Sequence, residues 1–295
     1  MTGPTITEDQ IRAYEEDGVV CLRGLFDGDF MALVARGIER ELADPGPGFV
    51  EQQEADQPGR FVTDYCASQR IPELQRFILD SPAAGAVAQV MRTRSVGFLM
   101  DVLWIKEPGT AKPTAWHQDQ PYFPLDGEKF CSIWLPVDPV DADTCLRFIR
   151  GSHRWGRWFS PRLTKAGERL FDAQAEASKS HYEEIPDFDA ELDRHEVLRW
   201  NMQPGDCLVF HGLAVHGGPG NNSASRRRRT LSTVWFGDDA RWGIRPSPPR
   251  PNFSGHGLAP GDPVESPLFP RLWPPGHEST GAERFSPDTE LSFTL

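Results

Sequence analysis

The stretch from Trp116 to Pro124 contains a histidine and an aspartate separated by one residue, His117 and Asp119. In a β-strand, side chains two residues apart point to the same face, so this spacing predicts that the imidazole and the carboxylate share one cavity. Two histidines and one carboxylate form the facial triad that binds Fe(II) and leaves positions open for other ligands. Because the pair alone is also common on protein surfaces, a metal site further requires a third ligand and a use for the open positions.

The third ligand has two candidates in the segment 204–218. This segment begins with a Pro-Gly-Asp turn and continues as a short apolar strand, which ends close to His211 and His216. Ligands held at strand ends suit a preorganised site, and the two glycines after His216 would let the backbone approach a metal closely. From the residues alone, either histidine could complete the triad.

Four consecutive arginines, Arg226 to Arg229, precede a predicted strand at 230–236. The simplest interpretation is a solvated basic loop. One arginine directed into a barrel would instead present a planar fork to a carboxylate. A facial-triad enzyme with a dicarboxylate cosubstrate requires such a fork.

The elements that must hold these residues form a helical first third and a strand-rich middle. Thr7 with Gln10 predicts a capping box at the start of the first helix. Helices are predicted near residues 11–17, 30–42, 72–79 and 82–91. Strands are predicted at residues 19–22, 96–106, 113–119, 130–137, 145–149, 196–200, 207–210, 213–216 and 230–236. This order indicates a mainly β fold with flanking helices, a jelly-roll or barrel.

The chain is interpreted as one domain in three parts. We expect a helical N-terminal layer over residues 1–92, a β core over residues 93–240, and a Pro/Gly-rich C-terminal wrap over residues 241–295. Residues 154–190 form a long polar insertion in the core, which is typical of functional or mobile segments. The composition of the wrap leaves its degree of order open.

Composition excludes several classes of function. The 295-residue chain has 31 basic and 43 acidic residues and a net charge of −12, which argues against general nucleic-acid binding. No apolar run approaches the roughly 20 residues that a membrane helix needs, and residues 1–8 do not form a secretory signal. The five cysteines are scattered without a Cys-x-x-Cys, so we expect a cytoplasmic protein without a disulfide framework. Oligomeric state is left open.

The motifs together resemble those of the phytanoyl-CoA dioxygenase family of Fe(II)- and 2-oxoglutarate-dependent oxygenases. The matching elements are Trp116–Asp119, Arg150–Gly156, Pro204–Asp206, and His216–Gly218 with the arginines after it. They occur in the family order over roughly residues 10–240. The resemblance implies a double-stranded β-helix core, which is a cupin-like jelly roll.

The resemblance also implies the iron ligands and the type of reaction. His117, Asp119 and His216 take the catalytic positions of the iron ligands, and His153 and His211 are then structural. Because halogenating relatives lack the carboxylate that Asp119 supplies, hydroxylation is implied. Fe(II), 2-oxoglutarate and O2 would be used, a small organic molecule hydroxylated, and succinate and CO2 released.

Binding of 2-oxoglutarate is implied for one of two arginines. In the family, the arginine that binds 2-oxoglutarate usually lies eleven residues after the distal histidine, which is the position of Arg227 here. In the family this arginine is also followed, two and four residues later, by small inward side chains. Thr230 and Ser232 match these two positions only if Arg228 is the binding arginine. Arg228 is therefore favoured, and Arg227 remains the alternative. Trp134 matches a position that packs on the cosubstrate in some relatives, although a core tryptophan is an equal interpretation.

The substrate itself is not indicated by the sequence. Residues beside the motif are candidate substrate contacts, namely Trp116, Gln118, Tyr122 and Phe123, together with Asp64, Tyr65 and Arg199. The stretch 143–147 departs from the small residues and glycine usual in the family, so pocket details there do not carry over. Two alternatives remain: a non-catalytic scaffold that has kept the fold, and a cupin-like metal enzyme without a cosubstrate.

Overall fold

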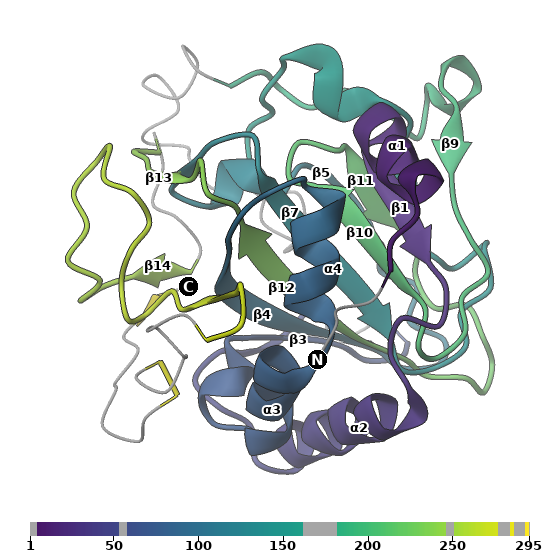
Figure 1. Ribbon diagram of the computed structural model, residues 1–295. Helices are drawn as coiled ribbons and strands as arrows, with labels where there is room; N and C mark the ends of the chain where they lie inside the picture. The colour runs from purple at the N-terminus through teal and green to yellow at the C-terminus, as the bar shows by residue number, and fades with distance from the viewer. Residues whose placement is uncertain are drawn as a thin grey trace.

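Two antiparallel β-sheets form the core of the chain in a computed structural model, which describes residues 5–52, 58–161, 182–245, 251–276, 284–285 and 293–294 (Figure 1). The larger sheet has the order β1 (Val19–Leu22), β10 (Cys207–His211), β7 (Phe130–Pro136), β12 (Arg228–Phe236), β4 (Val96–Lys106), β3 (Phe61–Tyr65) and β2 (Phe49–Glu51), and β15 (Arg271–Trp273) also pairs with β4. The smaller sheet has the order β5 (Thr114–His117), β11 (His216–Gly218), β8 (Arg147–Ile149) and β9 (Val197–Leu198).

Four helices cover one face of the larger sheet: α1 (Glu8–Asp17), α2 (Gly28–Ala43), α3 (Pro72–Asp80) and α4 (Ala83–Val90). All four were predicted from apolar periodicity, and the capping box of Thr7 and Gln10 is confirmed. Their apolar faces pack with Leu103, Ile133 and Leu231 of the sheet in one buried cluster. This burial fixes which face of each long strand points away from the helices.

The opposite face of the larger sheet points toward the smaller sheet, and residues of both sheets line the space between them. Because side chains alternate along a strand, burying Leu103 and Leu231 against the helices turns their neighbours inward. The register then pairs Lys106 with Arg228, Trp104 with Thr230, and Val102 with Ser232, while Trp134 of β7 also lies opposite Ser232. The strand register therefore determines the composition of the space between the sheets.

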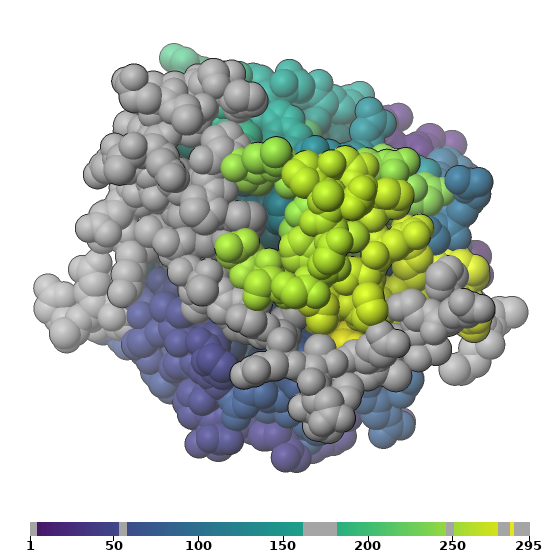
Figure 2. Space-filling view, turned by 90° about the vertical axis from the view of Figure 1, so that its left-hand side faces the viewer, coloured from purple at the N-terminus to yellow at the C-terminus, as the bar shows by residue number. Residues whose placement is uncertain are grey.

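Short elements and the C-terminal segments complete the fold. They are η1 (Ala67–Gln69), η2 (Gln120–Tyr122), β6 (Leu125–Asp126), η3 (Ser152–Trp155), η4 (Leu192–Arg194), β13 (Arg241–Trp242), β14 (Asn252–Phe253) and β16 (Phe293–Thr294). β13 pairs with β6, and β14 pairs with β16. Figure 2 shows the C-terminal segments, in yellow-green to yellow, spread over one face of the molecule.

Two predicted segments fall partly outside the described residues. Residues 162–181 belong to the predicted polar insertion, and residues 246–250, 277–283, 286–292 and 295 to the predicted Pro/Gly-rich wrap. Conversely, β2 and β3 lie in the polar stretch 49–70, for which no element was predicted. Within the described part of the chain, none of the helices is long and apolar enough to span a membrane.

Candidate metal centre

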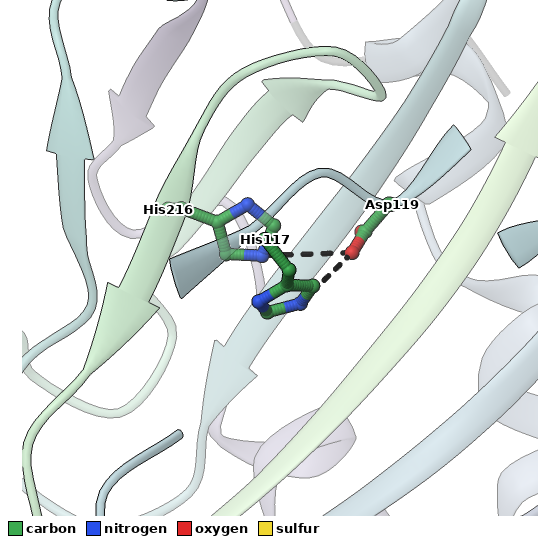
Figure 3. Close-up of side chains that lie close together, drawn as sticks. All are labelled: His117, Asp119 and His216. Carbon is green, nitrogen blue, oxygen red and sulfur yellow. Dashed lines mark ion pairs between the residues drawn. The ribbon is translucent and has the colours of Figure 1, made fainter. Parts of the chain in front are cut away.

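Three side chains converge between the two sheets, as Figure 3 shows. His117 ends β5, His216 begins β11, and the two residues are partners in the register of these strands. Asp119 Oδ1 lies 3.3 Å from His117 Nε2 and 3.5 Å from His216 Nε2. The possible ligand atoms all lie within 4.8 Å of one another, and no other group of three His, Cys, Asp or Glu in the described residues meets this criterion.

His117 and Asp119 line one cavity, as predicted, but a turn after the strand brings them together and not the alternation of side chains along a strand. β5 ends at His117. Asp119 has helical dihedral angles, φ −77° and ψ −46°, and precedes the 3-10 helix η2. The chain therefore curls after the strand, and this turn returns the carboxylate to the imidazole.

Both imidazoles are oriented to present Nε2 to the centre. His117 Nδ1 lies 2.8 Å from the carbonyl oxygen of Ala115, and His216 Nδ1 lies 3.0 Å from that of Ala214. A carbonyl oxygen only accepts hydrogen bonds, so Nδ1 carries the proton and Nε2 keeps its lone pair. Burial, together with nearby His117, lowers the pKa of His216 to about 4, so this ring is neutral near pH 7.

The carboxylate of Asp119 is ionised and fixed in position. Burial alone would raise its pKa, but the two histidines and the Ser132 hydroxyl outweigh this effect and lower it to about 2. Ser132 Oγ donates a hydrogen bond to Oδ2 at 2.6 Å, which leaves Oδ1 facing both imidazoles. Two imidazole nitrogens and one carboxylate oxygen are the donor set of a facial-triad Fe(II) site, and the residues present fit that ion.

The triad opens into a cavity of about 140 Å³ between the sheets. Most lining residues are apolar or aromatic, and the charged or titratable ones apart from tyrosine are the triad, Lys106 and Arg228. Among the sequence-predicted residues, Trp116, Tyr122, Phe123, Tyr65 and Trp134 line the cavity. The candidate site is therefore a largely apolar chamber with charge concentrated at the triad and at one further place.

That further place is a pair of buried cations. Arg228 is 8% exposed and Lys106 is 2% exposed. The Pro219 carbonyl oxygen accepts from both, at 2.8 Å from Arg228 Nη2 and 3.2 Å from Lys106 Nζ. Lys106 Nζ also donates to Thr114 Oγ1 at 3.1 Å.

No carboxylate forms an ion pair with Arg228 or Lys106 in the described part of the chain. Burial lowers the pKa of Arg228 to about 10, and burial together with Arg228 lowers the pKa of Lys106 well below its ordinary value. Two buried cations without a counter-charge favour binding of an anion.

Arg227 points elsewhere and its charge is already compensated. Its guanidinium donates to Glu107 Oε1 at 2.8 Å and to Glu39 Oε1 at 2.7 Å. Arg227 is the residue before β12, and it does not line the cavity that Arg228 lines.

Gln118 does not line the cavity. Its amide donates to the carbonyl oxygens of Arg157 at 3.0 Å and Leu213 at 2.9 Å, and its oxygen accepts from Phe159 N at 2.9 Å. All three partners are backbone atoms, so the side chain connects the metal-ligand turn to residues 157–159. This arrangement leaves it no free polar group for a substrate.

The other predicted residues outside the cavity also have local partners. Asp64 faces Glu41, and Arg199 pairs with Asp143 at 2.9 Å. The imidazole of His153 lies 3.1 Å from the Glu15 carbonyl oxygen, and His211 Nδ1 accepts from Leu213 N at 3.0 Å.

Sequence reasoning missed two residues, Ser132 and Lys106. Both were detectable in principle. Ser132 lies two residues from Trp134 in a predicted strand, and Lys106 lies two and four residues from Trp104 and Val102 in another, so in each strand these side chains face the same side. A polar residue at an inward position of an otherwise apolar strand was the available signal.

The chain is similar to proteins of known family in sequence and in structure. A family model described as phytanoyl-CoA dioxygenase (PhyH) matches residues 14–229. A "Probable phytanoyl-CoA dioxygenase" of Caenorhabditis elegans is 26% identical over 200 residues, covering 64% of this chain and 54% of the relative. The peroxisomal phytanoyl-CoA dioxygenase of Mus musculus is 24% identical over 257 residues, covering 80% of this chain and 70% of the relative. The chain thus spans about half the length of the nematode relative.

Solved structures share the fold. The 2-oxoglutarate-dependent epimerase SnoN from nogalamycin biosynthesis superposes with a TM-score of 0.70 at 20% identity, covering 90% of this chain and 95% of that protein. EctD from S. alaskensis, with 2-oxoglutarate and 5-hydroxyectoine, superposes with a TM-score of 0.61 at 20% identity, covering 81% of this chain and 80% of that protein. The predicted double-stranded β-helix, a cupin-like jelly roll, is confirmed.

Proposed function

The chain belongs to the phytanoyl-CoA dioxygenase (PhyH) family, and from this premise we propose that it is an Fe(II)- and 2-oxoglutarate-dependent dioxygenase that hydroxylates a small organic molecule. The observation that carries this proposal is the presence, in one cavity, of a His-Asp-His triad and a buried arginine without a carboxylate partner among the described residues. The triad suits the metal, and the arginine suits a dicarboxylate cosubstrate.

His117, Asp119 and His216 would bind Fe(II). Bound Fe(II) supplies the activation of O2 that couples decarboxylation of 2-oxoglutarate to hydroxylation of a C–H bond. The chain prepares the site before the ion arrives, since the Ala115 and Ala214 carbonyls fix the imidazole tautomers and Ser132 holds the carboxylate. Because a carboxylate is retained, we expect hydroxylation and not halogenation.

Arg228 would bind the distal carboxylate of 2-oxoglutarate. It lines the triad's cavity, whereas Arg227 is held by Glu39 and Glu107. Trp134 lines the same cavity beside the inward β12 residue Ser232, which is consistent with a wall for the cosubstrate chain. Burial of the guanidinium excludes water and strengthens its attraction for the carboxylate.

Turnover is tested by succinate release. The purified protein with Fe(II), O2 and 2-oxoglutarate should release succinate, stimulated by a metabolite extract that contains its substrate. His117→Ala and Asp119→Ala should each lower iron-dependent release by about 100-fold or more, because each removes a ligand atom. A protein that binds Fe(II) but neither binds nor consumes 2-oxoglutarate would be a scaffold and not an oxygenase.

The setting of the activity is proposed from composition. The substrate is a small molecule, and the chain's net charge of −12 does not favour nucleic acid as a partner. We infer a cytoplasmic location, because scattered cysteines, all five of them free, suit a reducing compartment. Fractionation of cells expressing the tagged chain checks this inference.

A further inference from the structure

The cavity has two chemically different ends, which the register of the large sheet separates. Along β12 the inward residues run from Arg228 through Thr230 and Ser232 to Val234. At the strand rise of about 3.4 Å per residue, Val234 lies roughly 20 Å from Arg228 along the strand. Ser132, which holds Asp119, is the register partner of Val234. The triad therefore lies toward the Val234 end, and the two cations lie at the other.

The triad end has uncharged walls. Tyr65 and Val102 are register partners on β3 and β4, Ser232 is the β12 partner of Val102, and Val234 is the next inward residue of β12. After the triad, Tyr122 and Phe123 continue the wall, and the Tyr122 ring stands at 88° to the His117 ring with centroids 6.0 Å apart. Among the described residues, no charged side chain other than the triad itself lines this end.

One charged side chain outside this lining, that of Arg147, contacts a lining residue and is already paired. Arg147 lies over the Trp116 ring at 4.9 Å and pairs with Asp189 at 3.0 Å. Placing a carboxylate, phosphate or ammonium group against the Tyr65 and Tyr122 walls would remove it from water without a counter-charge, which is costly. Aromatic side chains instead gain from packing against a flat apolar ring.

We propose that the compound oxidised by this enzyme is uncharged and presents a largely apolar ring to the triad, packed between Tyr65, Tyr122 and Phe123. This inference rests on the proposed function, in which Arg228 is occupied by 2-oxoglutarate and so is not available to the substrate. The reaction replaces one C–H bond of the ring compound with C–OH. One atom of O2 enters that hydroxyl group, and the other enters succinate as 2-oxoglutarate loses CO2.

Three probes that share one ring system test the proposal. They are tetralin carrying a hydroxyl, a carboxylate or an ammonium group. Equilibrium dialysis without O2 measures their binding to the protein, both with Fe(II) and 2-oxoglutarate and without them. The hydroxyl probe should bind to the loaded protein about tenfold or more tighter than either charged probe, because there the charged groups lack a counter-charge. In the unloaded protein Arg228 is free to pair with a carboxylate, so the carboxylate probe should lose affinity when 2-oxoglutarate is added.

Ring-removing variants and ring-keeping controls locate the binding. Tyr122→Ala and Tyr65→Ala should each weaken binding of the hydroxyl probe by about three- to tenfold, whereas Tyr122→Phe and Tyr65→Phe should bind it nearly as the wild type does. Tyr65→Arg should shift the preference toward the carboxylate probe, since it supplies the missing counter-charge.

Several results would overturn the proposal. They are a charged probe that binds to the loaded protein as tightly as the hydroxyl probe, no binding of any of the three, and alanine variants that bind like wild type. Failure of the proposed function has a different signature, namely no binding of Fe(II) or 2-oxoglutarate. Binding of the hydroxyl probe by the unloaded wild type, compared with the tyrosine variants, then decides the ring preference.

Discussion

The orientation of Asp119 depends on a hydroxyl group from the other sheet. Ser132 of β7 donates to Oδ2, and Oδ1 is thereby left for the centre that His117 and His216 share. Groups that orient a metal ligand in this way contribute to metal affinity although they do not touch the ion. We therefore expect Ser132 to matter for iron binding and not only for packing.

Replacing Ser132 tests this expectation. Ser132→Ala should raise the dissociation constant for Fe(II) by about 10- to 100-fold, because the freed carboxylate can rotate away from the imidazoles. Anaerobic titration calorimetry measures the affinity. Ser223→Ala is the matched control, since its hydroxyl accepts from Arg226 N at 2.9 Å in a surface loop. Equal affinities of the Ser132 variant and the control would contradict a role in orienting Asp119.

At the scale of elements, Gln118 connects the triad turn to the described arm of the polar insertion. Its three hydrogen bonds reach Arg157, Phe159 and Leu213, and the side chain is 2% exposed. The sequence placed Gln118 among the substrate contacts because it stands between two ligands. Its actual partners are distant in sequence, so their identity could not be predicted.

Gln118→Leu should lower the free energy of unfolding by about 2–4 kcal/mol, since it leaves buried backbone groups without partners. Denaturant titration measures this change, and limited proteolysis should detect faster cleavage near residues 157–159. A variant that keeps wild-type stability but loses binding of the hydroxyl probe would instead identify Gln118 as a substrate contact.

A second contact between elements joins α2 to β3 through two buried carboxyl groups. Asp64 is 1% exposed and faces Glu41, which is also 1% exposed. Burial, followed by the hydrogen bond and charge of Glu41, raises the pKa of Asp64 to about 9. Asp64 therefore keeps its proton near neutral pH.

This proton on Asp64 makes the free energy of unfolding dependent on pH. An aspartate in the unfolded chain releases its proton near pH 4 (about 3.9), so between that value and about pH 9 the folded state holds one proton more. The free energy of unfolding should then fall as pH rises through this window, and Asp64→Asn should make the dependence shallower. Urea titrations at pH 6, 7, 8 and 9 measure both slopes. If the free energy of unfolding changes with pH identically in the variant and the wild type, Asp64 does not keep its proton in the folded state.

At the scale of the whole molecule, the sequence predicted the long elements and the family, but not the contacts between them. The strands at 96–106 and 230–236 were recognisable as continuous β-prone runs. β3 was not, because its buried residues include Thr63 and Asp64, which read as polar surface. The helical turn at Asp119 was also not predicted, because the turn after His117 depends on packing and not on strand alternation.

The register of β12 decides which of Arg227 and Arg228 enters the cavity. One residue along the chain separates Arg227, which pairs with Glu107 just before β12, from Arg228, which is buried in the cavity. The inward small residues Thr230 and Ser232 already indicated Arg228, and Arg228 lines the cavity with them. The remaining question is whether this arginine binds 2-oxoglutarate.

Calorimetric titration of 2-oxoglutarate into the Fe(II)-loaded protein, without O2, tests the central claim most directly. The wild type should bind it, and Arg228→Gln should weaken binding by about 100-fold, as expected for loss of a charge-assisted carboxylate contact of about 3 kcal/mol. Arg227→Gln, the neighbouring control, should bind like the wild type. No binding by the wild type, or an equal loss in both variants, would contradict the account.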